Sequence, residues 1–205
     1  MPSHSQRYLE QVARIAAALD PEALERIVAG LAELRQRGGR LFFLGVGGSA
    51  ATGSHAVNDF RKIDGIEAYC PTDNVAEITA RTNDEGWERV FEAWLQTSRA
   101  TAADAIFVLS VGGGDAQRGV SANLVRAIDE AKRRGMTVYG IVGRQDSYTK
   151  HKGDEVIVVP VDDPSLLTPH AEAFQSVILH AIVCHPRLML QKNKWEEIQA
   201  TTPGE

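Results

Sequence analysis

The chain has few cysteines and no long apolar run, which argues against a disulfide-rich secreted protein and against a membrane-spanning one. Its two cysteines, Cys70 and Cys184, are far apart and belong to no CxxC pair. We expect two buried thiols in a reducing compartment, in preference to a disulfide. No apolar stretch approaches the roughly 20 residues of a membrane span, and the opening MPSHSQRYLEQ lacks the apolar core of a signal peptide. These features predict a cytoplasmic protein with no membrane partner.

An excess of basic residues is also missing. The formal net charge is -5, which argues against a nucleic-acid partner held by phosphate contacts. With 43% hydrophobic and 24% charged residues, the composition is that of an ordinary globular protein. Repeats, low-complexity tracts and linkers are absent too. We therefore expect a single domain over residues 1–205.

Apolar residues at three- and four-residue spacing predict helices over residues 5–37. Asp20-Pro21 interrupts this pattern, with Asp20 suited to cap the second helix and Pro21 to its first turn. We expect this N-terminal helical pair (1–38) to pack at an oligomer interface.

Apolar strands then alternate with helices over a core of residues 39–184. Strands are expected at 41–44, 66–70, 105–109, 137–142 and 156–159, and helices at 49–62, 85–98, 120–134 and 169–184. Strands that are apolar throughout predict a five-stranded parallel sheet covered on both faces, a three-layer αβα sandwich. His185-Pro186 ends the last helix. The polar C-terminal tail (185–205) is expected to fray after residue 198.

Glycines follow the first predicted strand, in LFFLGVGGSAATGSHAVNDF (41–60). Ligands of parallel sheets bind at the carboxyl ends of strands, where glycine permits close approach. The amides of Gly47 and Gly48 and the Ser49 hydroxyl lie at the start of a predicted helix, which attracts an anion. This first glycine loop (residues 45–49) predicts a phosphate site. A tight turn without a ligand is the alternative.

A second glycine loop (residues 110–121) follows the third predicted strand and begins SVGGGD. The first loop alone also satisfies the dinucleotide motif G-x-G-x-x-A. The acidic residue expected later in that motif would be Asp73, which comes late and beyond Pro71. Two glycine loops favour one small phosphorylated ligand, because a dinucleotide needs only the first.

His55 and Asp59 are four residues apart and so share one face of a helix. This spacing suits two ligands of one metal ion, a base with its partner, or a surface ion pair. Glu172, Gln175 and His180 lie in an apolar helix, where buried polar groups need partners. A hydrogen-bonded core histidine is the alternative for His180. Eight helical residues rise about 12 Å, so Glu172 and His180 meet at one ion only if their side chains converge.

Together these residues resemble the sugar isomerase (SIS) domain family, and within it the sedoheptulose 7-phosphate (phosphoheptose) isomerases, over nearly the whole chain. GVGGSA is similar to the family's GNGGSA, and Ser110, Ser121 and Asn123 to its serine-rich phosphate loop. His55 and His180 match the family's metal-binding histidines, the second of them also catalytic. Asp59 stands where the family has a glutamate that is both ligand and base, and Glu172 where it has a glutamine.

The resemblance implies a zinc-dependent homotetramer with active sites between subunits. Such enzymes convert sedoheptulose 7-phosphate to D-glycero-D-manno-heptose 7-phosphate. The implied zinc ligands are His55, Asp59, Glu172 and His180, of which Asp59, Glu172 and His180 are also catalytic, with the base either Asp59 or Glu172. The expected substrate contacts are Gly47, Gly48, Ser49, Asp73, Ser110, Gly112, Gly113 and Ser121, with Asp73 on sugar hydroxyls.

The chain departs from the family pattern at both glycine loops and in the metal shell. Val46 replaces an asparagine, and SVGGGD replaces an STSGNS-like loop and is followed by extra residues 116–119, so that two hydroxyls are missing. Asp59 and Glu172 raise the negative charge of the shell. An isomerase of another ketose phosphate therefore stays an alternative. The others are a non-catalytic SIS module that binds a phosphosugar or a replication initiator, and an NAD-type oxidoreductase.

Overall fold

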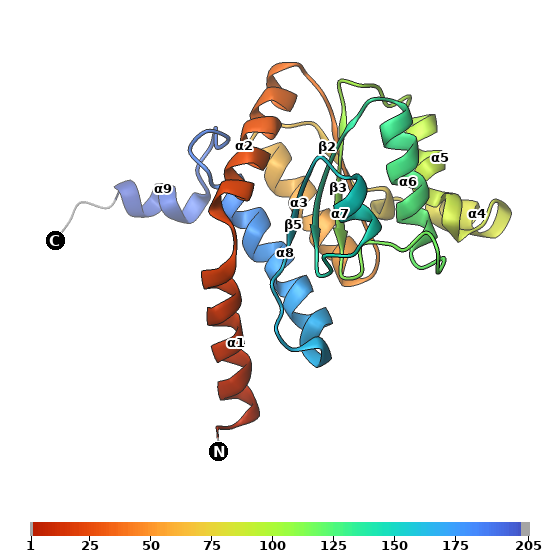
Figure 1. Cartoon of the computed structure of the whole chain (residues 1–205). Helices are drawn as coiled ribbons and strands as arrows, with labels where there is room; N and C mark the ends of the chain where they lie inside the picture. Colours follow the sequence, from red (N-terminus) through yellow and green to blue (C-terminus); the bar gives the residue numbers. More distant parts are fainter. Residues whose placement is uncertain (1, 202–205) are drawn as a thin grey trace.

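The computed structural model describes residues 2–201, in which a five-stranded parallel sheet lies between two layers of helices (Figure 1). The strand order is β2-β1-β3-β4-β5, and every adjacent pair is parallel. The strands are β1 (Leu41–Gly45), β2 (Ala68–Tyr69), β3 (Ala105–Ser110), β4 (Thr137–Val142) and β5 (Glu155–Val158). The predicted αβα sandwich is confirmed.

The helices cover both faces of this sheet. The longer ones are α1 (His4–Ala18), α2 (Pro21–Gln36), α3 (Gly48–Lys62), α4 (Val75–Asp84), α5 (Val90–Thr97), α6 (Ala122–Arg133), α8 (Leu167–Val183) and α9 (Lys194–Thr201). The short ones are α7 (Tyr148–Lys152) and the 3-10 turns η1 (Pro71–Asp73), η2 (Trp87–Arg89) and η3 (Pro164–Leu166). Over residues 2–201, none is long and apolar enough to cross a bilayer.

Alternate residues of each strand serve two separate cores. Leu41 and Phe43 of β1 pack with α2, α3 and α8, whereas Phe42 and Leu44 pack with α5 and α6. All four side chains are buried. A strand with helices on both faces has no solvated side, which is why these segments are apolar throughout.

The N-terminal helices begin as the sequence predicts. The Asp20 carboxylate caps α2 by accepting from the amide of Glu22, and Pro21 occupies the first position. Helix α1 projects from the body (Figure 1). It contacts the start of α8 through His170. The rings of Tyr8 and His170 stack with their centroids 4.4 Å apart, and the Gln11 Oε1 lies 2.8 Å from the His170 Nε2.

Several predicted boundaries were wrong. Strand β2 has two residues instead of five, and the helix expected over 85–98 is divided into η2 and α5. Part of the tail forms α9, since no proline or glycine lies between Pro186 and Pro203, and residues 202–205 lie outside the described part. Cys70 is buried, where desolvation raises the pKa of its thiol, but Cys184 is exposed because it lies on the solvent side of the last turn of α8.

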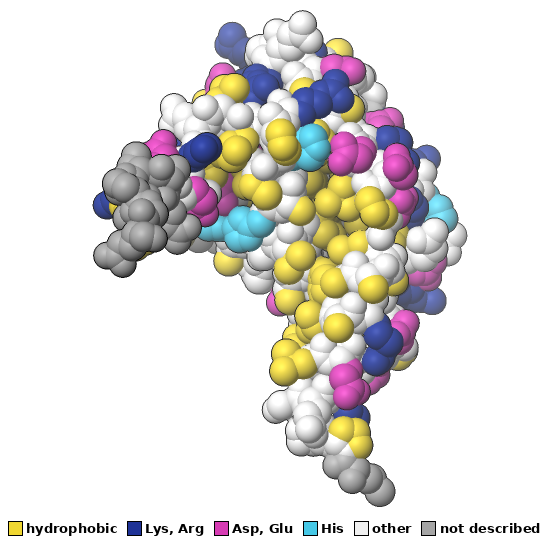
Figure 2. All heavy atoms as spheres, turned by 90° about the vertical axis from the view of Figure 1, so that its left-hand side faces the viewer, with side chains coloured by type: hydrophobic (Ala, Val, Ile, Leu, Met, Phe, Trp, Pro, Cys, Tyr) yellow, Lys and Arg dark blue, Asp and Glu magenta, His cyan; other side chains and the backbone are white. Residues whose placement is uncertain are grey.

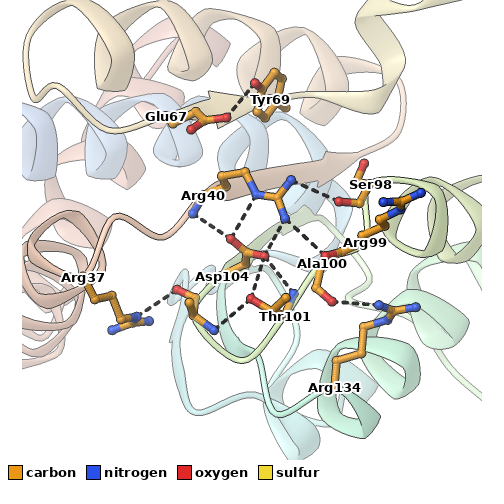
Figure 3. A network of polar contacts seen from close by, with 11 residues as sticks. Arg37, Arg40, Glu67, Tyr69, Ser98, Arg99, Ala100, Thr101, Asp104 and Arg134 are labelled. Atoms are coloured by element: carbon orange, nitrogen blue, oxygen red, sulfur yellow. Dashed lines mark hydrogen bonds and ion pairs between the residues drawn. The ribbon is translucent and has the colours of Figure 1, made fainter.

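An ion-pair network joins the amino-terminal edges of β1 and β3 (Figure 3). The Arg40 guanidinium donates to both carboxylate oxygens of Asp104, at 3.1 and 2.8 Å, and to the carbonyl of Ser98. Asp104 also accepts from the backbone amides of Arg40 and Thr101. These charged hydrogen bonds lower the pKa of the Asp104 carboxyl despite its burial. The network fastens the sheet at the end opposite the glycine loops.

Candidate metal centre and phosphate loops

Helices α3 and α8 lie side by side and run in the same direction, since each follows a parallel strand on the same face of the sheet. Gly48 at the start of α3 is beside Glu172, and seven residues further on His55 is beside His180. The two helices therefore bring predicted site residues from distant parts of the sequence together in two places.

His55, Asp59 and His180 form what we call the His–Asp–His group. The two imidazole Nε2 atoms are 3.0 Å apart, and the Asp59 Oδ2 lies 3.2 Å from the His55 Nε2 and 3.6 Å from the His180 Nε2. The Asn58 amide donates to the Asp59 Oδ1 and so leaves Oδ2 turned toward the histidines. The imidazoles are more than half exposed and the carboxylate is nearly buried.

This group fits a zinc ion. Tetrahedral zinc with nitrogen and oxygen ligands at about 2.0–2.1 Å separates neighbouring ligand atoms by roughly 3.3 Å. The three separations in the His–Asp–His group, 3.0 to 3.6 Å, lie around this value. Two neutral imidazoles and one carboxylate are also ligands that zinc accepts.

Glu172 does not join the other three predicted ligands. Its carboxylate lies over the first glycine loop, where a Cβ at Gly48 would be 2.7 Å from both of its oxygens. Gly47 has φ +62° and begins α3 without a side-chain cap, so this helix end carries unsatisfied amides that favour an anion. Ser49 is buried behind it. The role of Glu172 as a zinc ligand stays a prediction that requires its side chain to turn along α8.

The second glycine loop is ordered by its neighbours. The Ser110 hydroxyl accepts from the amide of Gly113, and the carbonyl of Gly113 accepts from the amide and the hydroxyl of Thr149. Ser121 begins α6 with φ +49° and offers no side-chain cap. A Cβ on Gly112 would meet nothing within 4 Å. Gly112 and Ser121 are thus the more open members of this predicted phosphate loop.

Asp73 lies apart from these groups. Its carboxylate accepts from the hydroxyl of Ser54, on the side of α3 that faces β2. It lines a cavity of about 470 Å³ with Tyr69, Val75 and Trp94. Its contact with sugar hydroxyls stays a prediction.

Two residues beside the His–Asp–His group were missed from the sequence. Cys184 and Asn193 line the same cavity as His55, Asp59 and His180, of about 310 Å³. Cys184 follows His180 by four residues, so helical spacing could have placed both on one face. No pattern pointed to Asn193, because the tail returns to α3 through backbone bonds from Leu190 and Gln191 to the Ile63 carbonyl.

Comparisons with known proteins identify the family of the chain. The SIS domain family model matches residues 7–143. The lincomycin biosynthesis protein LmbN of Streptomyces lincolnensis is 30% identical over 184 residues, which are 85% of this chain and 65% of that protein. The phosphoheptose isomerase of Leptospira biflexa is 30% identical over 165 residues, covering 76% of this chain and 81% of the relative.

Solved structures share the fold. A phosphoheptose isomerase from Francisella tularensis superposes with a TM-score of 0.76 at 21% identity, over 89% of this chain and 97% of that one. The phosphoheptose isomerase of Neisseria gonorrhoeae gives 0.74 at 22% identity, over 88% and 93% of the two chains. With the family model and these relatives in agreement, the chain belongs to the SIS domain family and is an isomerase.

Proposed function

We propose that this isomerase interconverts an aldose and a ketose phosphate, and that its substrate is sedoheptulose 7-phosphate, which becomes D-glycero-D-manno-heptose 7-phosphate. One observation carries the proposal: three ligand atoms converge at zinc spacing two turns of helix beyond a loop suited to an anion. The substrate class follows the isomerase relatives. The site thus offers separate places for a reacting carbonyl and for a phosphate.

His55, Asp59 and His180 would hold a zinc ion, with Glu172 as a further ligand if its side chain turns. Zinc, when bound, supplies a Lewis acid for the two oxygens at the reacting carbons. Asp59 and Glu172 supply the carboxylate oxygens of this metal site, so the position of the zinc relative to the substrate depends on these two side chains.

The isomerisation moves one proton between adjacent carbons through an enediol, so its base must face both carbons. We assign the base to Glu172, since its carboxylate has no hydrogen-bond partner among residues 2–201; the assignment requires its side chain to turn from the first glycine loop toward the His–Asp–His group. Asp59, engaged by Asn58 and both histidines, is the alternative base. His180 would exchange a proton with the substrate oxygen.

A homotetramer in the cytoplasm is part of the proposal. Helix α8 exposes an apolar row beside His180, made up of Ala173, Val177, Ala181 and Cys184, with Val177 51% exposed. Leu9 of α1 is 65% exposed, and hydrophobic side chains are spread over this face of the molecule (Figure 2). A neighbouring subunit on this face would cover the apolar row and close the open side of the His–Asp–His group.

Proton NMR of the purified protein with sedoheptulose 7-phosphate in D2O tests the function. With zinc added, we expect an aldose anomeric signal and deuterium at C2, and we expect a chelator to abolish both. His180→Ala should lose turnover by at least about 100-fold while remaining folded. His4→Ala, which changes an exposed histidine of α1, serves as the matched control. An active His180→Ala protein, or zinc-loaded wild type that leaves this sugar unchanged, would contradict the proposal.

A further inference from the structure

The insertion that distinguishes the second glycine loop is an ordered turn. Asp115 and Val120 form an antiparallel bridge, with reciprocal backbone hydrogen bonds of 2.9 and 3.1 Å. The Asp115 carboxylate accepts from the amides of Gln117 and Arg118 inside the turn. These hydrogen bonds fix the backbone of the turn and therefore the position from which the Arg118 side chain extends.

Arg118 shares its surroundings with an arginine from the next strand end. Arg144 follows β4, and both arginines line a small cavity of about 60 Å³ together with Gly112, Gly114 and their ion-pair partners Asp115 and Asp146. A larger cavity of about 370 Å³ adjoins it through Gly114, Arg118 and Asp146. Two arginines from separate loops therefore line one cavity beside the second glycine loop.

The existing ion pairs leave these arginines available. Arg144 donates to Asp146 through its Nε and one terminal nitrogen, and both side chains are substantially exposed, at 42% and 69%, so its other terminal nitrogen is left to donate to a ligand. The Arg118 Nε is 3.7 Å from the Asp115 carboxylate, beyond hydrogen-bond distance. Among residues 2–201 the Arg118 guanidinium donates no hydrogen bond, so its N–H groups are available to a ligand.

Further unused donors lie at the same end of the sheet. Helix α6, of 12 residues, begins without a side-chain cap from Ser121. Asn123, in its first turn, is fully buried, and its Nδ2 has no hydrogen-bond partner in the described residues. A buried donor without a partner is costly, so the Asn123 Nδ2 is left with an unmet demand for an acceptor near the start of α6.

We propose that Arg118 and Arg144 bind the phosphate of a phosphate-monoester substrate at the second glycine loop. The proposal rests on the proposed function and names the groups that take over from the two missing hydroxyls. A guanidinium fork matches phosphate oxygens with paired, charge-assisted hydrogen bonds, which a hydroxyl does not. The extra residues 116–119 are then what brings Arg118 to the ligand.

Isothermal titration calorimetry on the full chain tests this assignment without relying on turnover. The probes are sedoheptulose 7-phosphate, unphosphorylated sedoheptulose and inorganic phosphate. We expect Arg118→Gln and Arg144→Gln each to weaken binding of the two phosphate-bearing probes by roughly tenfold or more. Binding of unphosphorylated sedoheptulose should not change. Arg126→Gln, an equal charge change at an exposed position of α6, should bind all three like the wild type.

The outcomes separate this inference from the proposed function. Arginine-dependent binding of sedoheptulose 7-phosphate by a protein that does not isomerise it would support the phosphate assignment and contradict the function. Normal turnover with dissociation constants unchanged in the Arg118→Gln/Arg144→Gln double variant would overturn the assignment alone. The assignment would also be wrong if the wild type bound neither phosphate-bearing probe. The same holds if the variants weakened the binding of inorganic phosphate alone, which would indicate an adventitious ion only.

Discussion

Two aspartates near the end of α3 show how differently neighbouring carboxylates can be held. Asp59 is fixed by Asn58 on one oxygen and faces two imidazoles with the other. Asp64, five residues later, is fully buried, and neither of its oxygens has a hydrogen-bond partner in the described residues. Burial raises the pKa of Asp64 to about 7, opposed by the charge of Arg35 and reinforced by that of Asp59. Asp64 is therefore a source of pH-dependent stability.

We predict that the free energy of unfolding falls as pH rises from about 4 to about 7 and then levels off. The sign follows because the folded protein binds the Asp64 proton more tightly than the unfolded chain, whose pKa is near 3.8. Asp64→Asn removes this dependence. The free energy of unfolding of Asp64→Asn minus that of the wild type should rise by about 2–3 kcal/mol between pH 5 and pH 8.

Urea unfolding at several pH values measures this difference. Asp162→Asn, at an exposed aspartate, should follow the wild-type curve. If the Asp64→Asn and wild-type curves run parallel across the range, the buried carboxyl is not the source of the pH dependence.

Helical periodicity explains which site residues the sequence could identify. His55 and Asp59 needed only the spacing of one helix, and the first glycine loop placed that helix at the end of a strand. The meeting of His55 with His180 depends on the alignment of two helices 125 positions apart in sequence, which came from the family resemblance. Glu172 and Asp73 were harder, because the direction of a side chain depends on packing that no spacing records.

At the scale of elements, long apolar strands and helices with strong periodicity were predicted well, and short elements were not. Helix α7 has five residues and β2 has two, too few to show a period. The helix expected from residue 85 starts later because of Gly86, whose φ of +92° separates η2 from the end of α4. Packing decides such details, whereas the strands are fixed by burial on both faces.

The Arg40–Asp104 network should stabilise the sheet without touching the site. Asp104→Ala leaves a partly buried guanidinium and two backbone amides without their acceptor, and should cost about 3–5 kcal/mol. Arg40→Ala should also destabilise, and the double variant should lose less than the sum, with a coupling of about 1–3 kcal/mol.

A double-mutant cycle by denaturant unfolding gives this coupling. The exposed pair Arg14–Asp162, at 3.4 Å, provides the comparison and should couple by less than about 1 kcal/mol. Additive losses at Arg40 and Asp104 would show that the network contributes nothing beyond its separate parts.

At the scale of the whole molecule, the apolar row on α8 and the projecting α1 leave one face uncovered. Val177→Glu places a charge in the middle of this row, at a position 51% exposed in the single chain. The folded monomer should tolerate the change, whereas a subunit contact should not, because an unpaired charge would be buried there.

Light scattering after size exclusion should therefore find a tetramer for the wild type and a smaller species for Val177→Glu, with an unchanged circular dichroism spectrum. The control is Glu196→Gln, at an exposed position of α9. Ser176→Glu is not suitable, because Ser176 is half-buried on α8. A wild type that is monomeric at micromolar concentration would contradict the predicted assembly.

The parallel course of α3 and α8 has a consequence for chain length. Gly48 and His55 are seven helical residues apart, a rise of about 10 Å, and Glu172 and His180 repeat nearly the same interval on the neighbouring helix. Both helices are rigid and packed on one sheet, so the interval is fixed. Together they set a fixed spacing: a sugar that contacts the first glycine loop and the His–Asp–His group at once must carry the two contacting groups at the matching distance along its backbone.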